Sequence, residues 1–408
     1  GNSAFGFDAL GANTEGINNH AFGNYALLNN TTGDGNVAMG ISSLKSNTTG
    51  EFNISIGGQS LEDNNWSYNV SVGTSALQKN TSGNHSIGIG HFALSKNTTA
   101  SNNIAIGSHA LENTITGAGN TAVGYNALKL NTAGSNSAFG YDALKENTSG
   151  SANTGSGTHS LQENVGGSYN TAHGYTSLYK NTSGNSNTSV GHSSLKENVT
   201  GSSNTAIGYG AGDAITSGSS NVYVGHGADA SGGNVSNEIV IGSGQVGAGT
   251  NTVSIGNTQI TAIKGQVAFS TYSDERIKRN IDDSKLGLNF IMKLRPVTYK
   301  MKNPADYPNE LLEARFRDVP GNGPFVGEYE RPADDENTYD GLIAQEVKEA
   351  MDEVGVNWSG WSKNESDGKE GVQYGALTIP LIKAIQEQQK LIEKLEARII
   401  ELESSKQK

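Results

Sequence analysis

Cysteine is absent from the 408-residue sequence, which excludes disulfides, zinc–thiolate sites and a cysteine nucleophile. No apolar run approaches the roughly 18 residues that a membrane-spanning helix needs, and no basic and apolar leader opens the chain, so we expect no membrane insertion. The net charge of −12 argues against a nucleic-acid partner. The sequence begins at GNSAFG, inside a repeat and without Met, and we expect it to be part of a longer protein.

Apolar and charged residues are both scarce, at 34% and 17% of the chain, while Gly occurs 54 times. Ordinary domains have roughly 45–50% apolar and about 25% charged residues. Such a composition indicates either disorder or a structure that buries little surface per residue, and the regular spacing of the apolar residues disfavours disorder. Residues 1–272 hold 8 Lys, 14 Asp or Glu and no Arg, whereas residues 273–408 hold the other 20 basic and 26 acidic groups. This change predicts a domain boundary between residues 272 and 273.

A repeat of 17 residues occupies residues 1–256. In the copy NSAFGYDALKENTSG, residues 136–150, the segment SAF alternates as a short strand does. Gly140 permits a tight bend or a close backbone approach, Leu144 recurs four residues after the Gly in most copies, and NTSG has the composition of a turn. The marker glycines follow one another at steps of 17, with two steps of 16: Gly6, Gly23, Gly40, Gly57, Gly73, Gly90, Gly107, Gly124, Gly140, Gly157, Gly174, Gly191, Gly208, Gly225 and Gly242.

One unit of 17 residues cannot close a hydrophobic core, but stacked units can. We therefore predict a mainly β shaft for residues 1–256, either a trimeric β-solenoid or β-roll or a triple β-helix. Because a single coil is thin and presents few apolar residues, we expect several chains, and specifically three, to share the core. The pattern drifts after Tyr209, so residues 209–270 are expected to continue the fold with changed edges or to form a neck, with residues 257–272 as the linker.

This style of repeat resembles the shafts of phage and virus tail fibres and, more distantly, the heads of trimeric autotransporter adhesins. The NTT and NTS strings match N-glycosylation acceptors, but a turn motif explains them without a sugar. The sequence contains no GGxGxD repeat, which argues against calcium binding of that kind. The eight His fall at positions that do not match between copies and lack i, i+4 pairing, so we interpret them as surface variation. We predict no metal and no cofactor.

The stretch YSDERIKRNI, residues 272–281, marks the boundary. A Ser hydroxyl is a poor nucleophile unless a base takes its proton, and Lys can be that base when burial disfavours its charged form. Ser273 and Lys278 lie about one turn apart in a turn or short helix. The spacing alone favours a structural role, in which Ser273 is an N-cap and Lys278 a solvated base.

The string SDERIKRNI resembles the start of the endosialidase-type intramolecular chaperone domain, a self-cleaving C-terminal domain of phage tail spikes and fibres. Residues 286–302 resemble its helix followed by a strand, residues 341–354 its central helix, and residues 372–403 its terminal helix. The resemblance implies a small α+β domain over residues 273–408. It also implies that Ser273 is the nucleophile, that Lys278 is its base, and that the chain is cut between Tyr272 and Ser273 in a single turnover.

The segment between residues 303 and 340 contains five Pro and an acidic run. We expect an extended arm or a long loop with one short helix near Glu310 to Phe316. In the string IAQEV, Gln345 and Glu346 are expected to pack, cap a helix or bridge chains, and we assign them no chemistry.

The last helix carries a heptad seam, and we expect a coiled coil over residues 378–403. Arg398 and Glu403 are placed for an ion pair between chains. Alternating Ile and Leu favour two parallel strands by pattern alone, but the resemblance implies three, and we predict three because the shaft needs the same symmetry. The seam steps four and three residues: Leu381, Ile385, Gln388, Ile392, Leu395, Ile399 and Leu402.

Together these features predict a homotrimeric viral tail fibre for host attachment, located in the virion, whose receptor is a carbohydrate or protein of the host surface. Its C-terminal domain would direct trimerisation and folding and then release itself by cleavage. One alternative is a cellular adhesin at the cell surface that uses the same chaperone. Another is a glycan-degrading spike, which would need paired carboxylates on neighbouring coils, whereas the 14 acids of the shaft are scattered.

Overall fold

The structure is a computed structural model that describes residues 1–260, 263, 273–303, 306–308, 336–363 and 368–406. The chain divides into two compact units, Gly1–Asn257 and Thr258–Lys408, and each is a fold of its own.

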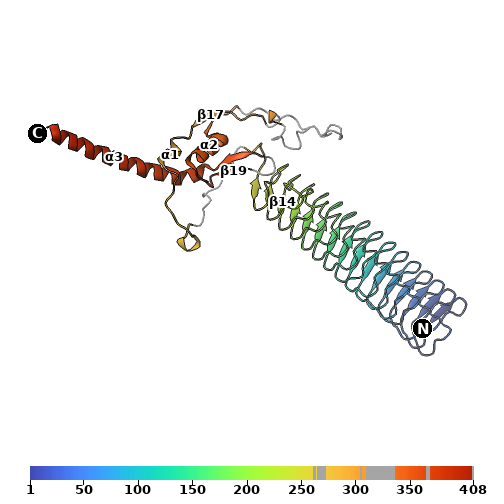
Figure 1. Ribbon diagram of the computed structural model, residues 1–408. Coiled ribbons are helices and arrows are strands. Elements are labelled where there is room, and N and C mark those ends of the chain that lie inside the picture. The colour runs from blue at the N-terminus through green and yellow to red at the C-terminus, as the bar shows by residue number, and fades with distance from the viewer. Residues whose placement is uncertain (261–262, 264–272, 304–305, 309–335, 364–367, 407–408) are drawn as a thin grey trace. The chain divides into compact units, whose positions relative to one another are not determined.

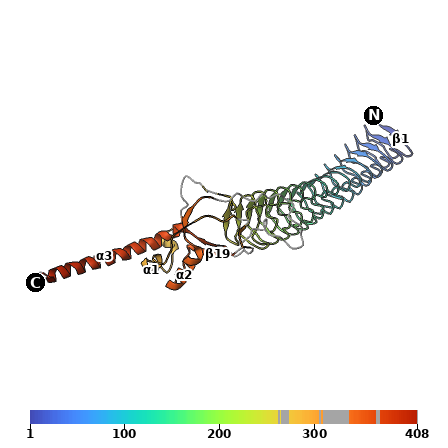
Figure 2. The same ribbon diagram turned by 90° about the horizontal axis from the view of Figure 1, so that it is seen from above.

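The first unit is a β-solenoid, seen as the stack of coils in Figures 1 and 2. Every coil contributes one strand of three residues, and consecutive strands pair in parallel in a 16-stranded sheet whose order follows the sequence. The strand SAF of the sample copy is β9, and its Ala138 pairs with Gly155 in β10. The predicted repeat fold is thus confirmed as a solenoid. The strands are β1 Ser3–Phe5, β2 His20–Phe22, β3 Val37–Met39, β4 Ile54–Ile56, β5 Val70–Val72, β6 Ile87–Ile89, β7 Ile104–Ile106, β8 Thr121–Val123, β9 Ser137–Phe139, β10 Thr154–Ser156, β11 Thr171–His173, β12 Thr188–Val190, β13 Thr205–Ile207, β14 Val222–Val224, β15 Ile239–Ile241 and β16 Val253–Ile255.

The core of the solenoid lies inside a single chain. The recurring Leu is completely buried from Leu27 to Leu195, together with small residues at the middle of the strands and before the Leu. Leu144 adopts a left-handed conformation with φ of 51°, as the other core leucines do, which costs roughly 1–2 kcal/mol per residue and is offset by burial. The prediction that three chains share this core is therefore wrong: a column of Leu beside Ala and Ser fills the thin coil without a partner.

Asparagine forms two buried columns that run along the solenoid. The Asn153 amide nitrogen donates to the carbonyl of Gly167 at 2.8 Å, and the Asn136 oxygen accepts from the Asn153 backbone N–H at 3.0 Å. In the second column, Asn164 donates to the Asn147 oxygen at 2.6 Å. Buried polar groups need such partners, so these columns let a chain with few apolar residues close its interior.

The marker Gly is required by the stacking of the coils. Gly140 has φ of +143°, and a Cβ there would lie 2.6 Å from the carbonyl oxygen of Gly157 on the next coil. Gly therefore permits both the positive φ and the close approach between coils.

The last coils keep the fold but change the core, which explains the drift of the repeat after Tyr209. Where the Leu is replaced by Gly212, the ring of Tyr223 is completely buried and fills the space, so that a Cβ on Gly212 would lie 2.7 Å from it. The described part of residues 209–270 therefore continues the solenoid through β16.

The second unit combines small sheets with helices. Its elements are η1 Glu275–Ile277, α1 Leu288–Ile291, β17 Val297–Tyr299, β18 Tyr339–Gly341, α2 Ala344–Val354, β19 Trp361–Lys363, β20 Glu370–Val372, η4 Tyr374–Leu377 and α3 Thr378–Lys406. β17 pairs antiparallel with β18, and β19 with β20. The core joins Phe290 of α1 to Val347 and Met351 of α2 and to Trp358. The predicted helix and strand, central helix and terminal helix are all present, whereas the predicted helix near Glu310 to Phe316 lies outside the described residues.

Candidate functional site

The boundary motif folds into a single short turn. Asp274 is the N-cap of η1, and its side chain accepts the N–H of Arg276 at 2.9 Å. Its carbonyl accepts the N–H of Ile277, and the Glu275 carbonyl accepts the N–H of Lys278. The chain therefore reverses within five residues and returns the side chain of Lys278 toward Ser273.

The two predicted reactive groups are in contact, because Lys278 Nζ lies 2.8 Å from Ser273 Oγ. Asp274, not Ser273, caps the turn, so the Ser273 hydroxyl is not committed to the backbone. A neutral Lys amine at this distance could take the proton of the Ser hydroxyl. The scissile carbonyl of Tyr272 lies outside the described residues.

Both side chains of the pair are exposed in the single chain. Lys can act as a base only in its neutral form, which burial favours and water disfavours. The geometry of a Ser–Lys pair is thus present in one chain, while the desolvation that a Lys base needs must come from outside the described part of this chain.

Asp274 and Arg276 also form an ion pair in which the guanidinium Nε lies 3.0 Å from both carboxylate oxygens. The hydrogen bond from Arg276 holds the pKa of Asp274 below its usual value, and the backbone bond at the cap adds to this. Spacing alone did not identify this interaction, although a Ser-Asp-Glu string is a known helix-start signal.

Two acidic residues that follow the motif in the sequence, Glu346 and Glu387, make contacts that connect elements of the second unit. Glu346 of α2 pairs with Arg295, whose side chain lowers the pKa of Glu346 by hydrogen bonding. Glu387 of α3 accepts the N–H of Leu288 at 2.8 Å and so links α3 to the start of α1. Glu346 is therefore held in an ion pair within the chain, and its lack of a chemical role stays a prediction.

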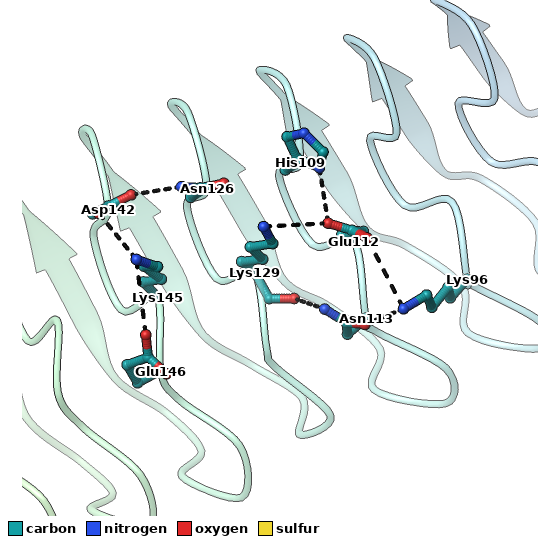
Figure 3. Close-up of polar contacts among 9 residues, drawn as sticks. All are labelled: Lys96, His109, Glu112, Asn113, Asn126, Lys129, Asp142, Lys145 and Glu146. Atoms are coloured by element: carbon teal, nitrogen blue, oxygen red, sulfur yellow. Dashed lines mark hydrogen bonds and ion pairs between the residues drawn. The ribbon is translucent and has the colours of Figure 1, made fainter.

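Charged side chains of the solenoid gather on one face of successive coils, as Figure 3 shows. Glu112 pairs with Lys96 and with Lys129 on the neighbouring coils. His109 contacts the same carboxylate with its Nδ1 at 2.8 Å. Glu112 is thus held in ion pairs that connect its coil to both neighbours.

Histidines also belong to a row of rings along the solenoid, which sequence reasoning missed. Tyr125 stacks on Tyr141 with ring centroids 5.4 Å apart, and His192 stacks on Tyr209 at 4.9 Å. His192 directly follows the marker Gly, as Tyr125 and Tyr141 do. The interpretation that the His positions do not match is therefore wrong for this row, and alignment on the Gly could have found it.

Among the described residues, no group of three or more His, Cys, Asp or Glu side chains could hold a metal ion. No helix in the same part of the chain is both long enough and apolar enough to cross a membrane.

Comparison with known families found a match that lies in the second unit. Residues 273–356 match a family model described as the chaperone of endosialidase. The match begins at Ser273 and spans the short turn, α1, β17, β18 and α2. The predicted C-terminal chaperone domain is confirmed over these residues, while the resemblance of residues 372–403 rests on their motif alone. Comparisons with curated proteins and with solved structures found no match.

Proposed function

We propose that this chain is a fibre protein that assembles as a homotrimer and then cuts off its own C-terminal chaperone between Tyr272 and Ser273. The observation that carries the proposal is the 2.8 Å contact between Lys278 Nζ and Ser273 Oγ at the first residue of a chaperone-of-endosialidase match. A Ser–Lys pair and a family boundary coincide there with a change in composition.

The reaction is a transfer of the acyl group of Tyr272. Neutral Lys278 takes the hydroxyl proton while Ser273 Oγ attacks the preceding carbonyl, and the peptide C–N bond breaks as the freed Ser273 amine takes a proton. The resulting ester joins the Tyr272 acyl group to Ser273 Oγ, and water hydrolyses it to leave a Tyr272 carboxylate and a Ser273 with free amine and hydroxyl. No outside oxidant or cofactor is needed.

The shaft gives a physical reason for a chaperone. Its parallel pairings are built from near-identical copies, and strands that look alike can pair out of register. Folds rich in non-local pairing also form slowly. A C-terminal domain that first sets the number of chains and their register would guide assembly. Cleavage would then remove this domain, so that the shaft could not unfold by the reverse of its assembly and would be kinetically stable.

Two exposed apolar surfaces support association between copies. The third residue of each strand points outward and is apolar in 14 of the 16 strands, from Phe5 to Ile255. At about 4.8 Å per strand this row extends roughly 75 Å, far more than isolated surface hydrophobics would. In α3, the seam residues Ile385 and Leu395 expose 64% and 63% of their surface in the single chain.

We infer three copies because the shaft and the helix seam must share one symmetry, as the resemblance to trimeric fibres also implies. The Arg398–Glu403 pair between chains is part of this proposal; within the chain, Arg398 pairs with Glu401. The finished shaft would sit in a virion and attach to a carbohydrate or protein of the host surface.

The test is a denaturing gel of the expressed chain beside Ser273→Ala and Lys278→Ala, with Lys285→Ala as the matched control. We expect the wild type and the control to yield fragments of 272 and 136 residues, the smaller beginning SDERIK. Both dyad variants should remain at 42.6 kDa and sediment as trimers. A wild-type chain that stays whole would refute self-cleavage, and equal cutting of the variants would refute the roles of Ser273 and Lys278.

A further inference from the structure

We propose that Asp274 and Arg276 are positioning residues of the self-cleavage reaction, an inference that rests on the function proposed above. They would act through the turn that they close, and neither would receive or donate the reacting proton.

The contacts of the turn converge on Asp274. Its carboxylate accepts the N–H of Arg276 at 2.9 Å, and its carbonyl accepts the N–H of Ile277 at 3.2 Å. The Nε of the Arg276 side chain donates to the same carboxylate at 3.0 Å. η1 has three residues and none of them is buried. Because so short a helix is marginal by itself, these local bonds must supply the order that tertiary packing gives to other helices.

The cap at Asp274 also keeps Ser273 available. Ser is itself a preferred N-cap residue, and a Ser273 hydroxyl that accepted a backbone N–H would be drawn into the turn. With Asp274 as the cap, the hydroxyl instead lies 2.8 Å from Lys278 Nζ. The assignment of the cap to the second residue of the motif thus separates the structural role from the chemical one.

Arg276 has a second effect, because it occupies the Asp274 carboxylate with a two-pronged contact. A carboxylate held in this way keeps the orientation in which it accepts the Arg276 backbone N–H at 2.9 Å. The guanidinium is permanently charged, so the pairing persists over the range in which the reaction would run.

The experiment follows pulse-labelled full-length chain in cell-free translation and measures the rate at which the 42.6 kDa band is converted. Asp274→Ala should slow cleavage on the order of 100-fold, as a small misplacement of reacting groups does. Asp274→Asn keeps an oxygen that can accept the cap bond and should restore the rate to within roughly tenfold of the wild type. Glu275→Ala retains the carbonyl that Lys278 uses and is the matched control, with an unchanged rate.

Two further readouts separate positioning from other roles. The pH at which the rate of Asp274→Ala is half maximal should equal that of the wild type, since only the alignment is lost, and trimer formation should be unaffected. Cleavage of Asp274→Ala at the wild-type rate, or an Asp274→Asn variant as slow as Asp274→Ala, would overturn the proposal. A wild-type chain that is not cut, or a Ser273→Ala chain that is, would instead overturn the proposed function itself.

Discussion

The carboxyl of Asp229 should make the last coils of the shaft more stable in mild acid than at neutral pH. Burial raises its pKa from 3.8 to about 6, although the backbone N–H groups of Ala214 and Ala230 oppose this by donating to its Oδ1. The negative charges of Asp213 and Glu238 add to the increase. The folded chain therefore holds this proton at pH values where the unfolded chain has released it.

The sign and size of the effect follow from linkage between proton binding and folding. Stability decreases as pH rises wherever the folded state binds more protons, which for Asp229 is the range from about 4 to above 6. The shift corresponds to roughly 3 kcal/mol at neutral pH, and about half of that is already lost at pH 5. Asp229→Asn can keep the acceptor oxygen without the charge, so it should stabilise these coils by up to about 3 kcal/mol at pH 7.5.

The assay is hydrogen exchange of peptides from residues 209–232, corrected for the intrinsic pH dependence, because local opening is what the substitution alters. Wild-type chain should open more readily at pH 7.5 than at pH 5, and Asp229→Asn should remove most of that difference. Asp34→Asn is the matched control, since its carboxylate also accepts a backbone N–H, from Ile17, but belongs to a coil near the start of the shaft. Equal protection of the wild type at both pH values would refute the reasoning.

The interior of the shaft yields two more predictions. Gly140→Ala should destabilise its coil by about 2 kcal/mol or more in denaturant unfolding, because the new Cβ would lie 2.6 Å from the next coil. Gly166→Ala, where the nearest neighbour of a Cβ would be 3.4 Å away, should be nearly neutral. Equal losses of stability in the two variants would contradict the stacking argument. Asn153→Ala leaves buried hydrogen-bonding partners unsatisfied, which costs about 1–3 kcal/mol of stability for each, and should make its coil sensitive to proteases. The control Asn185→Ala removes an exposed side chain and should not. Identical digestion patterns for the two variants would rule out a structural role for the column.

The sequence by itself determined the elements that depend on local spacing. The 17-residue step set the strands, the marker Gly and the buried Leu, and the heptad steps set α3 from Thr378 to Lys406. The spacing of Ser273 and Lys278 already indicated that a single turn could bring the two side chains together. These features are readable because a period along the chain translates directly into a face of a strand or helix.

Only the tertiary structure decided which side chains meet across coils. The sequence suggested a core shared between chains, whereas the structure places the core inside one chain. The Asn columns around Asn153 and the left-handed leucines such as Leu144 close each coil internally. Isolated copies of the repeat cannot reveal this, since Asn in NTSG has the composition of an ordinary turn until the coils are stacked. At the junction it assigned the cap to Asp274 in place of Ser273, because only the folded turn shows which oxygen the backbone uses.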